Sequence, residues 1–155
     1  MPNEFNVNDI FEIAVKIEEN GAAFYRDAAK KINDENHKKF LLDLAAMEDD
    51  HVVTFSDMQK ELKGQEAMTT GFDPGDENIA YLKALADTRV FFKKEHPDDS
   101  FQSILGIAIQ TEKDSIAFYL GMKELIPAKF GQAKIDDIIK EEMSHIRIIA
   151  KKLIA

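Results

Sequence analysis

The sequence predicts an all-α protein, a four-helix bundle in which a long crossover containing a short helix joins the second and third main helices. Four stretches place apolar residues three and four positions apart, the spacing of one face of an α-helix. No stretch shows the apolar–polar alternation of a half-buried strand. The chain also repeats itself: Glu18 and Glu112 stand 94 residues apart within similar segments. The repeat indicates two related helix pairs.

The first helix pair is predicted over residues 9–62. Asp9 offers a helix start, and the apolar seam of the first helix then continues to about residue 31. A short turn at Asn33-Asp34 follows. The second helix, over about 35–62, is therefore expected to fold back antiparallel to the first.

The crossover is predicted over residues 63–98. Glycine and proline punctuate 63–75, which is typical of a loop. Residues 77–92 have the period of a short helix, whose expected packing residues are Ile79, Leu82, Leu85 and Phe91. A connection of this size can return the chain along the bundle, so the third main helix is expected to run parallel to the second.

The second helix pair is predicted over residues 99–155. The third main helix is expected from about Asp99 to Leu125, and Pro127 is expected to open the fourth, which reaches nearly to Ala155. With 155 residues, of which 45% are hydrophobic, the chain has the size of one domain with one core. Residues 1–155 are therefore predicted to form a single domain.

Composition excludes several kinds of function. The chain has no cysteine, so disulfides, iron–sulfur clusters and an iron site with four thiolate ligands are excluded within it. A net charge of −9 argues against nucleic acid or an anionic membrane as a partner. The N-terminus lacks a basic region followed by an apolar one, and no run of about 18 apolar residues occurs. We expect a cytoplasmic protein.

Polar residues interrupt the apolar seams of all four main helices. The pair Glu48-x-x-His51 returns as Glu142-x-x-His145, and both members are displaced by 94 residues, the offset that also separates Glu18 from Glu112. Residues three apart on a helix project from one face, so each Glu-x-x-His pair can hold one metal ion between its side chains. A single pair of this kind is common on an acidic, solvated helix. Two pairs and two further glutamates with one shared offset favour a dinuclear metal site.

The residue types indicate which metals are expected. Four glutamates on inward seams need compensation, because desolvating each carboxylate costs several kcal/mol. Two divalent cations would balance the four negative charges, and each would also gain one imidazole ligand. Carboxylate-rich ligation without thiolates suits iron or manganese. We expect two iron ions per chain, with manganese as the alternative and zinc as a substitute in a crystal.

These residues resemble the ferritin-like superfamily and, within it, the rubrerythrin-type di-iron carboxylate proteins. The resemblance covers both helix pairs and implies Glu18, Glu48, His51, Glu112, Glu142 and His145 as ligands, with Glu48 and Glu142 as bridges. It also implies that Tyr25 and Tyr119, each seven residues after a ligand glutamate, hydrogen-bond the carboxylates and take part in electron transfer. Packing in the aromatic core is the alternative role for these tyrosines.

Two departures from the family pattern bear on function. Rubrerythrins carry a rubredoxin-like iron domain that this chain lacks, so its electrons are expected from an external donor protein. They also place an additional glutamate at the position of Ser115, and the remaining set of six ligands resembles that of bacterioferritin. Bacterioferritins, however, place a haem-ligating methionine at the position of Asp49.

The sequence thus predicts a non-haem di-iron oxidoreductase that reduces peroxide or dioxygen and forms a homodimer. The apolar residues of the crossover helix, beyond those that a four-helix core needs, are one reason to expect the dimer. Two alternatives stay open. One is a protein that oxidises and stores ferrous iron, and the other is a metal-binding bundle without enzymatic activity.

Overall fold

The computed structural model of the chain describes residues 7–63, 77–87, 98, 100–126, 128 and 131–155. These residues form helices and contain no strand, which confirms the all-α prediction. The helices are α1 (Val7–Lys30), α2 (Glu35–Lys63), α3 (Glu77–Asp87), α4 (Phe101–Lys123) and α5 (Gln132–Ile154).

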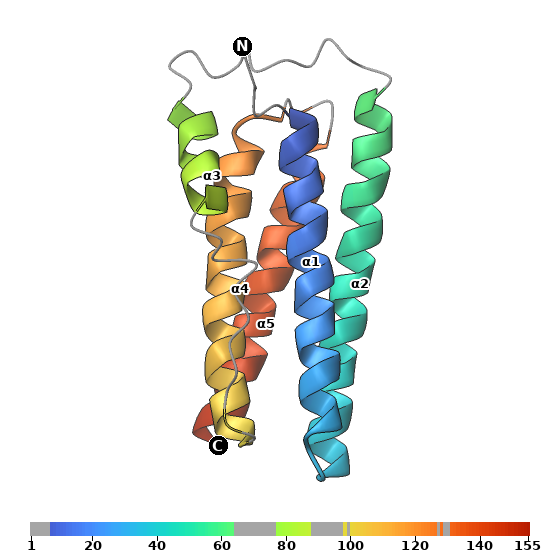
Figure 1. The fold of residues 1–155 in the computed structure, drawn as a ribbon, viewed down its shortest axis with the longest axis vertical. Coiled ribbons are helices and arrows are strands. Elements are labelled where there is room, and N and C mark those ends of the chain that lie inside the picture. The colour runs from blue at the N-terminus through green and yellow to red at the C-terminus, as the bar shows by residue number, and fades with distance from the viewer. Residues whose placement is uncertain (1–6, 64–76, 88–97, 99, 127, 129–130) are drawn as a thin grey trace.

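The four long helices form a bundle of two antiparallel pairs, α1 with α2 and α4 with α5 (Figure 1). Helices α2 and α4 run in the same direction, as the predicted crossover requires. The short helix α3 packs beside α4. Each main helix therefore presents its inward seam to the same central axis.

Side-chain and backbone hydrogen bonds define where the helices begin. Asp34 accepts the N–H groups of Asn36 and His37 at 2.8 and 3.0 Å, at the turn into α2. The Ser100 hydroxyl accepts the Ser103 N–H at 3.1 Å and so caps α4. Both starts agree with the sequence prediction to within two residues.

The start of α5 differs from the prediction. Helix α5 begins at Gln132, not at Pro127, which lies outside the described residues. Gly131 precedes α5 with φ 113°, a left-handed conformation that only glycine adopts without strain. The Gln132 side chain donates to the carbonyl of Lys123 at 2.9 Å and ties the start of α5 to the end of α4. The chain thus turns by means of this glycine before α5 begins.

The interior consists of two apolar clusters with a polar layer between them. One cluster lies toward the N-terminal end of α1 and includes Phe11, Phe55, Phe118, Met122 and Ile135. The other lies toward the opposite end and includes Ala28, Leu41, Leu44, Leu105 and Ile149. Burying these side chains gives the bundle most of its stability, at about 25 cal/mol per Å² of apolar surface. The polar layer is therefore enclosed along the bundle axis by apolar residues.

Helix α3 is attached through its apolar face. Leu82 is fully buried, and Ile79 and Leu85 pack against the same cluster, as predicted, whereas Phe91 lies outside the described residues. The Tyr81 hydroxyl also donates to the carbonyl of Ala117 at 2.9 Å. These three apolar residues thus attach α3 to the core of its own chain.

Side chains of α3 lie directly against Gly121 of α4. A Cβ atom at this position would lie 2.7 Å from the Tyr81 ring and 2.9 Å from Leu82. We expect Gly121→Ala to destabilise the fold by about 1–3 kcal/mol, because overpacking forces neighbouring groups to shift. Gly106→Ala in the same helix is the matched control, since a Cβ there meets nothing within 4 Å. The control should raise stability by about 0.5–1 kcal/mol. Urea denaturation measures both, and equal effects would contradict this account of α3 docking.

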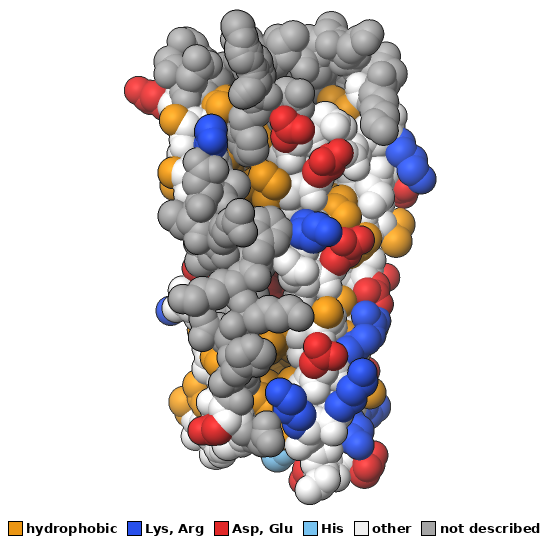
Figure 2. Space-filling view, viewed as in Figure 1, with side chains coloured by type: hydrophobic (Ala, Val, Ile, Leu, Met, Phe, Trp, Pro, Cys, Tyr) orange, Lys and Arg blue, Asp and Glu red, His pale blue; other side chains and the backbone are white. Residues whose placement is uncertain are grey.

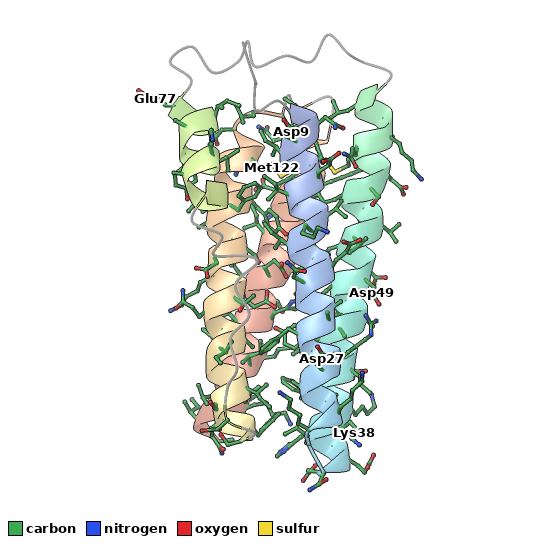
Figure 3. The ribbon with its side chains drawn as sticks, in the orientation of Figure 1. Asp9, Asp27, Lys38, Asp49, Glu77 and Met122 are labelled. Carbon is green, nitrogen blue, oxygen red and sulfur yellow. The ribbon has the colours of Figure 1, made fainter. Side chains whose placement is uncertain are left out.

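The two halves of the bundle differ on their outer surfaces. Arg26 and Asp49 form an exposed ion pair between α1 and α2, and Asp49 lies on the outer side of α2 (Figure 3). The repeat places Leu120 and Met143 at the equivalent positions of α4 and α5, where they are 45% and 48% exposed. Acidic and basic side chains mix along the α1 and α2 side of the face in Figure 2. The repeat therefore does not extend to this pair of outer positions.

None of the described helices has both the length and the apolar character needed to cross a membrane.

Candidate metal centre

The polar layer contains all six residues that the sequence singled out as metal ligands. Each of the four main helices contributes at least one of them. All are at most 4% exposed: Glu18, Glu48, His51, Glu112, Glu142 and His145. The inward seams of the helices place these side chains at one level of the bundle, between the two apolar clusters.

The six side chains form two overlapping groups of four. The first is Glu18, Glu48, His51 and Glu142, and the second is Glu48, Glu112, Glu142 and His145. Within each group, one candidate ligand atom per residue lies within 4.8 Å of all the others. Glu48 and Glu142 belong to both groups. The geometry thus offers two neighbouring metal positions that share two glutamates.

Both histidines direct the same ring nitrogen toward the centre. His51 Nδ1 lies 3.2 Å from Glu18 Oε1 and 3.5 Å from Glu48 Oε2. His145 Nδ1 lies 3.1 Å from Glu142 Oε1 and 3.6 Å from Glu112 Oε2. The two rings are nearly parallel, with their centroids 6.0 Å apart. The two histidines, which the sequence repeat relates, therefore have similar surroundings in the fold.

The donor atoms at the centre fit a pair of metal ions. Among the described residues, five buried atoms of this cluster have no hydrogen-bond partner: Glu48 Oε2, Glu112 Oε1, Glu142 Oε1 and Oε2, and His145 Nδ1. A buried polar atom without a partner costs about 1–3 kcal/mol, so native proteins rarely keep several together without a ligand. Carboxylate oxygens with one imidazole nitrogen for each position suit iron or manganese. The donor atoms therefore fit two metal ions of the kind expected from the sequence.

The two tyrosines connect opposite halves of the bundle. Tyr25 of α1 donates its hydroxyl to Glu112 Oε2 of α4 at 2.7 Å, and Tyr119 of α4 donates to Glu18 of α1. Burial raises the pKa of both phenols well above the usual value, and the adjacent carboxylates Glu112 and Glu18 raise it further. Both tyrosines therefore stay protonated and act as hydrogen-bond donors. They also pack in the apolar clusters, so hydrogen bonding to the carboxylates and packing in the aromatic core occur together.

The protein's own groups give the site unusual pKa values. Burial raises the pKa of Glu48 and of Glu142 well above 4.5, and nearby glutamates such as Glu18 and Glu112 add to the effect. Burial lowers the pKa of His51, but hydrogen bonds to Glu18 and Glu48 outweigh it and raise that pKa to about 11. Burial alone would raise the pKa of Glu18, yet contacts with His51 hold it below its usual value. Metal ions must therefore displace protons from these side chains.

Gly21 and Ser115 occupy equivalent positions in the two halves. A Cβ atom on Gly21 would lie 3.1 Å from Glu48 Oε1, so the absence of a side chain leaves room for this carboxylate. Ser115 is buried, and its hydroxyl donates to the carbonyl of Thr111 in its own helix at 3.0 Å. The Ser115 hydroxyl therefore donates its hydrogen bond to the backbone of its own helix.

One polar neighbour of the site, Glu141, is not indicated by the sequence pattern. Its carboxylate lies 2.7 Å from His51 Nε2, on the side of the ring that faces away from the centre. The repeat gives no signal for it, because the equivalent position is occupied by Met47. Its place directly before Glu142, a predicted ligand, is the one clue that the sequence offers.

Comparison with known proteins agrees with this geometry. The rubrerythrin family model matches residues 9–89, which cover α1 from its third residue and all of α2 and α3. The chain belongs to the rubrerythrin family.

The match to rubrerythrins covers the first helix pair and the crossover as far as residue 89. Glu112, Glu142 and His145 lie beyond it and join the site through the fold. A solved structure from Thermotoga maritima, described as a ferritin-like diiron-carboxylate protein, has a similar fold, with a TM-score of 0.67 and 24% sequence identity. The similarity covers 99% of this chain and 97% of that chain. No curated protein matches. The family and the buried cluster together support the binding of two metal ions.

Proposed function

We propose that this member of the rubrerythrin family is a di-iron redox protein that reduces peroxide, or dioxygen, with electrons from an external donor protein. The observation that carries the proposal is the pair of overlapping ligand groups joined by Glu48 and Glu142, all buried. The six residues Glu18, Glu48, His51, Glu112, Glu142 and His145 would hold the two irons. The external donor and a homodimer belong to the proposal on family resemblance alone.

Peroxide needs two electrons for each molecule to become two waters, and dioxygen that takes up two electrons and two protons becomes peroxide. Two ferrous ions, when bound, would supply one electron each, and a peroxide that also takes up two protons would leave as two waters. The chain's own part is to hold the ligands. Tyr119 and Tyr25 orient Glu18 and Glu112 through hydrogen bonds, and each histidine presents Nδ1 to the centre. The apolar clusters above and below limit the access of water along the axis.

A ferroxidase that oxidises ferrous iron is the second candidate. The observation that favours it is Ser115, which stands where rubrerythrins have an additional glutamate and whose hydroxyl is bonded to Thr111. The ligand set then stays at six and resembles that of bacterioferritin. Iron counting separates the candidates, because a storage protein accumulates many irons per chain and a redox enzyme holds about two. A metal-binding bundle without turnover is the third alternative.

We expect peroxide to oxidise the di-ferrous protein faster than dioxygen, with a preference on the order of tenfold, or about 1.4 kcal/mol in the barrier. The preference should be smaller than that of a rubrerythrin that has the additional glutamate. Stopped-flow oxidation by each oxidant measures the ratio. If dioxygen is clearly the faster oxidant, the ferroxidase or oxidase assignment replaces the peroxidase.

Ser115→Glu tests the structural cause of this preference. The new carboxylate would stand beside the Glu112 position and is expected to widen the preference for peroxide. Ser115→Ala is the matched control, because it removes the hydroxyl without adding a ligand. The two variants should differ from each other in their oxidant ratio, and Ser115→Ala should match the unmodified chain.

A further inference from the structure

Glu141 holds the outer side of the His51 ring. Its Oε1 lies 2.7 Å from Nε2, while Nδ1 on the other side of the ring faces Glu18, Glu48 and Glu142. An ionised carboxylate can only accept a hydrogen bond, so Nε2 is the donor and carries a proton. In the neutral ring, Nδ1 then has its lone pair directed at the centre. Glu141 thus selects the tautomer of His51 that binds a metal.

The contact joins a buried ring to an exposed carboxylate. The His51 side chain is 3% exposed and the Glu141 side chain is 60% exposed. Glu141 contributes little to the packing of the bundle, so its contact with His51 can be removed without opening the core. This separates an effect on the metal position from an effect on folding.

Among the residues that the structure describes, the other half of the site shows no such arrangement. Displacing Glu141 and His51 by the repeat offset of 94 residues gives Met47 and His145. Within the described part of the chain, His145 makes its ion-pair contacts through Nδ1, toward Glu48, Glu112 and Glu142. Met47 is 39% exposed and has no carboxylate with which to hold an imidazole N–H. The two metal positions, although equal in ligand type, differ in what supports their histidines.

We infer that Glu141 is a positioning residue that makes the two metal positions unequal, so that the position formed with Glu18 and His51 binds the first ion. Partners of this kind fix the orientation of a ligating histidine and raise its basicity, and losing one costs about 10–100-fold in metal affinity. The inference rests on the proposed metal centre but not on the oxidant or the electron donor.

Calorimetric titration of the chelator-treated protein with Co²⁺ alone tests the inference. The unmodified chain should bind two ions in separate steps whose affinities differ by about tenfold or more. Glu141→Ala should weaken the first step by about 10–100-fold and bring it close to the second. Glu141→Gln keeps a neutral acceptor oxygen and should restore part of the loss. A purely structural role would not show this partial rescue.

Two further variants complete the design. Asp137→Ala removes an equal exposed charge one turn earlier on α5 and should leave both steps unchanged. Met47→Glu offers His145 the missing partner and should strengthen the second step. The melting temperatures of all these variants without metal should agree within a few degrees.

The outcomes separate the inference from the proposed function. Two equal steps in the unmodified chain, or the same effect from Glu141→Ala and Asp137→Ala, would overturn the inference and leave the metal centre intact. A chain that binds no Co²⁺ would overturn both.

Discussion

The metal-loaded chain is expected to melt on the order of 10 °C above the metal-free chain. An ion that binds only the folded state, at a thousandfold excess over its Kd, adds about 4 kcal/mol, and each kcal/mol raises Tm by about 2–4 °C in a chain of this size. The physical source is the cluster of four buried glutamates, whose mutual repulsion two divalent ions would relieve. Calorimetry before and after chelation measures the difference.

The gap between the two melting temperatures should widen as pH rises from about 5 to 8. Without metal, Glu48, Glu142 and His51 have raised pKa values in the folded state. They stabilise the fold fully at a pH below their unfolded pKa values, which are 4.5 for the glutamates and 6.5 for histidine. This stabilisation is lost as the pH rises through the pKa values of the folded state, and the folded pKa of His51 is about 11. The lowered pKa of Glu18 acts in the opposite direction, and only at acid pH. Metal affinity meanwhile increases as protons leave. Identical melting curves with and without metal would contradict the dinuclear site.

Glu142→Gln is expected to remove both metal ions, whereas Glu112→Gln should leave about one per chain. Glu142 belongs to both ligand groups, and Glu112 belongs only to the group that contains His145. Losing a direct ligand should weaken metal affinity by more than the roughly 10–100-fold that follows the loss of a residue hydrogen-bonded to a ligand. Metal analysis after dialysis measures the stoichiometry. Equal metal content in the two variants would contradict the shared role of Glu142.

Two control measurements distinguish the loss of a metal ligand from misfolding of the variant. Glu19→Gln makes the same chemical change at an exposed site next to Glu18 and should keep two metals. Without metal, Glu142→Gln should be at least as stable as the unmodified chain, because one buried carboxyl among like charges is replaced by a neutral amide. A large loss of metal-free stability would instead indicate damage to the bundle.

The sequence by itself determined the helix pairs, the antiparallel turn near Asp34 and the set of six candidate ligands. These depend on spacing along one helix, since residues three or four apart share a face whatever the helix packs against. The repeat added a second, independent copy of the same spacing. For this reason Glu48 and His51 could be paired before any fold was known.

Only the tertiary structure decided which helices exchange contacts at the centre. Tyr25 bonds Glu112 on another helix rather than Glu18, which lies seven residues earlier on its own. Glu141 reaches His51 across the bundle, where the repeat offers no counterpart. The start of α5 also depended on Gly131 and on a tie to the end of α4. Contacts between helices follow from how their seams rotate and pack against one another, and the periodicity of a single helix does not contain that information.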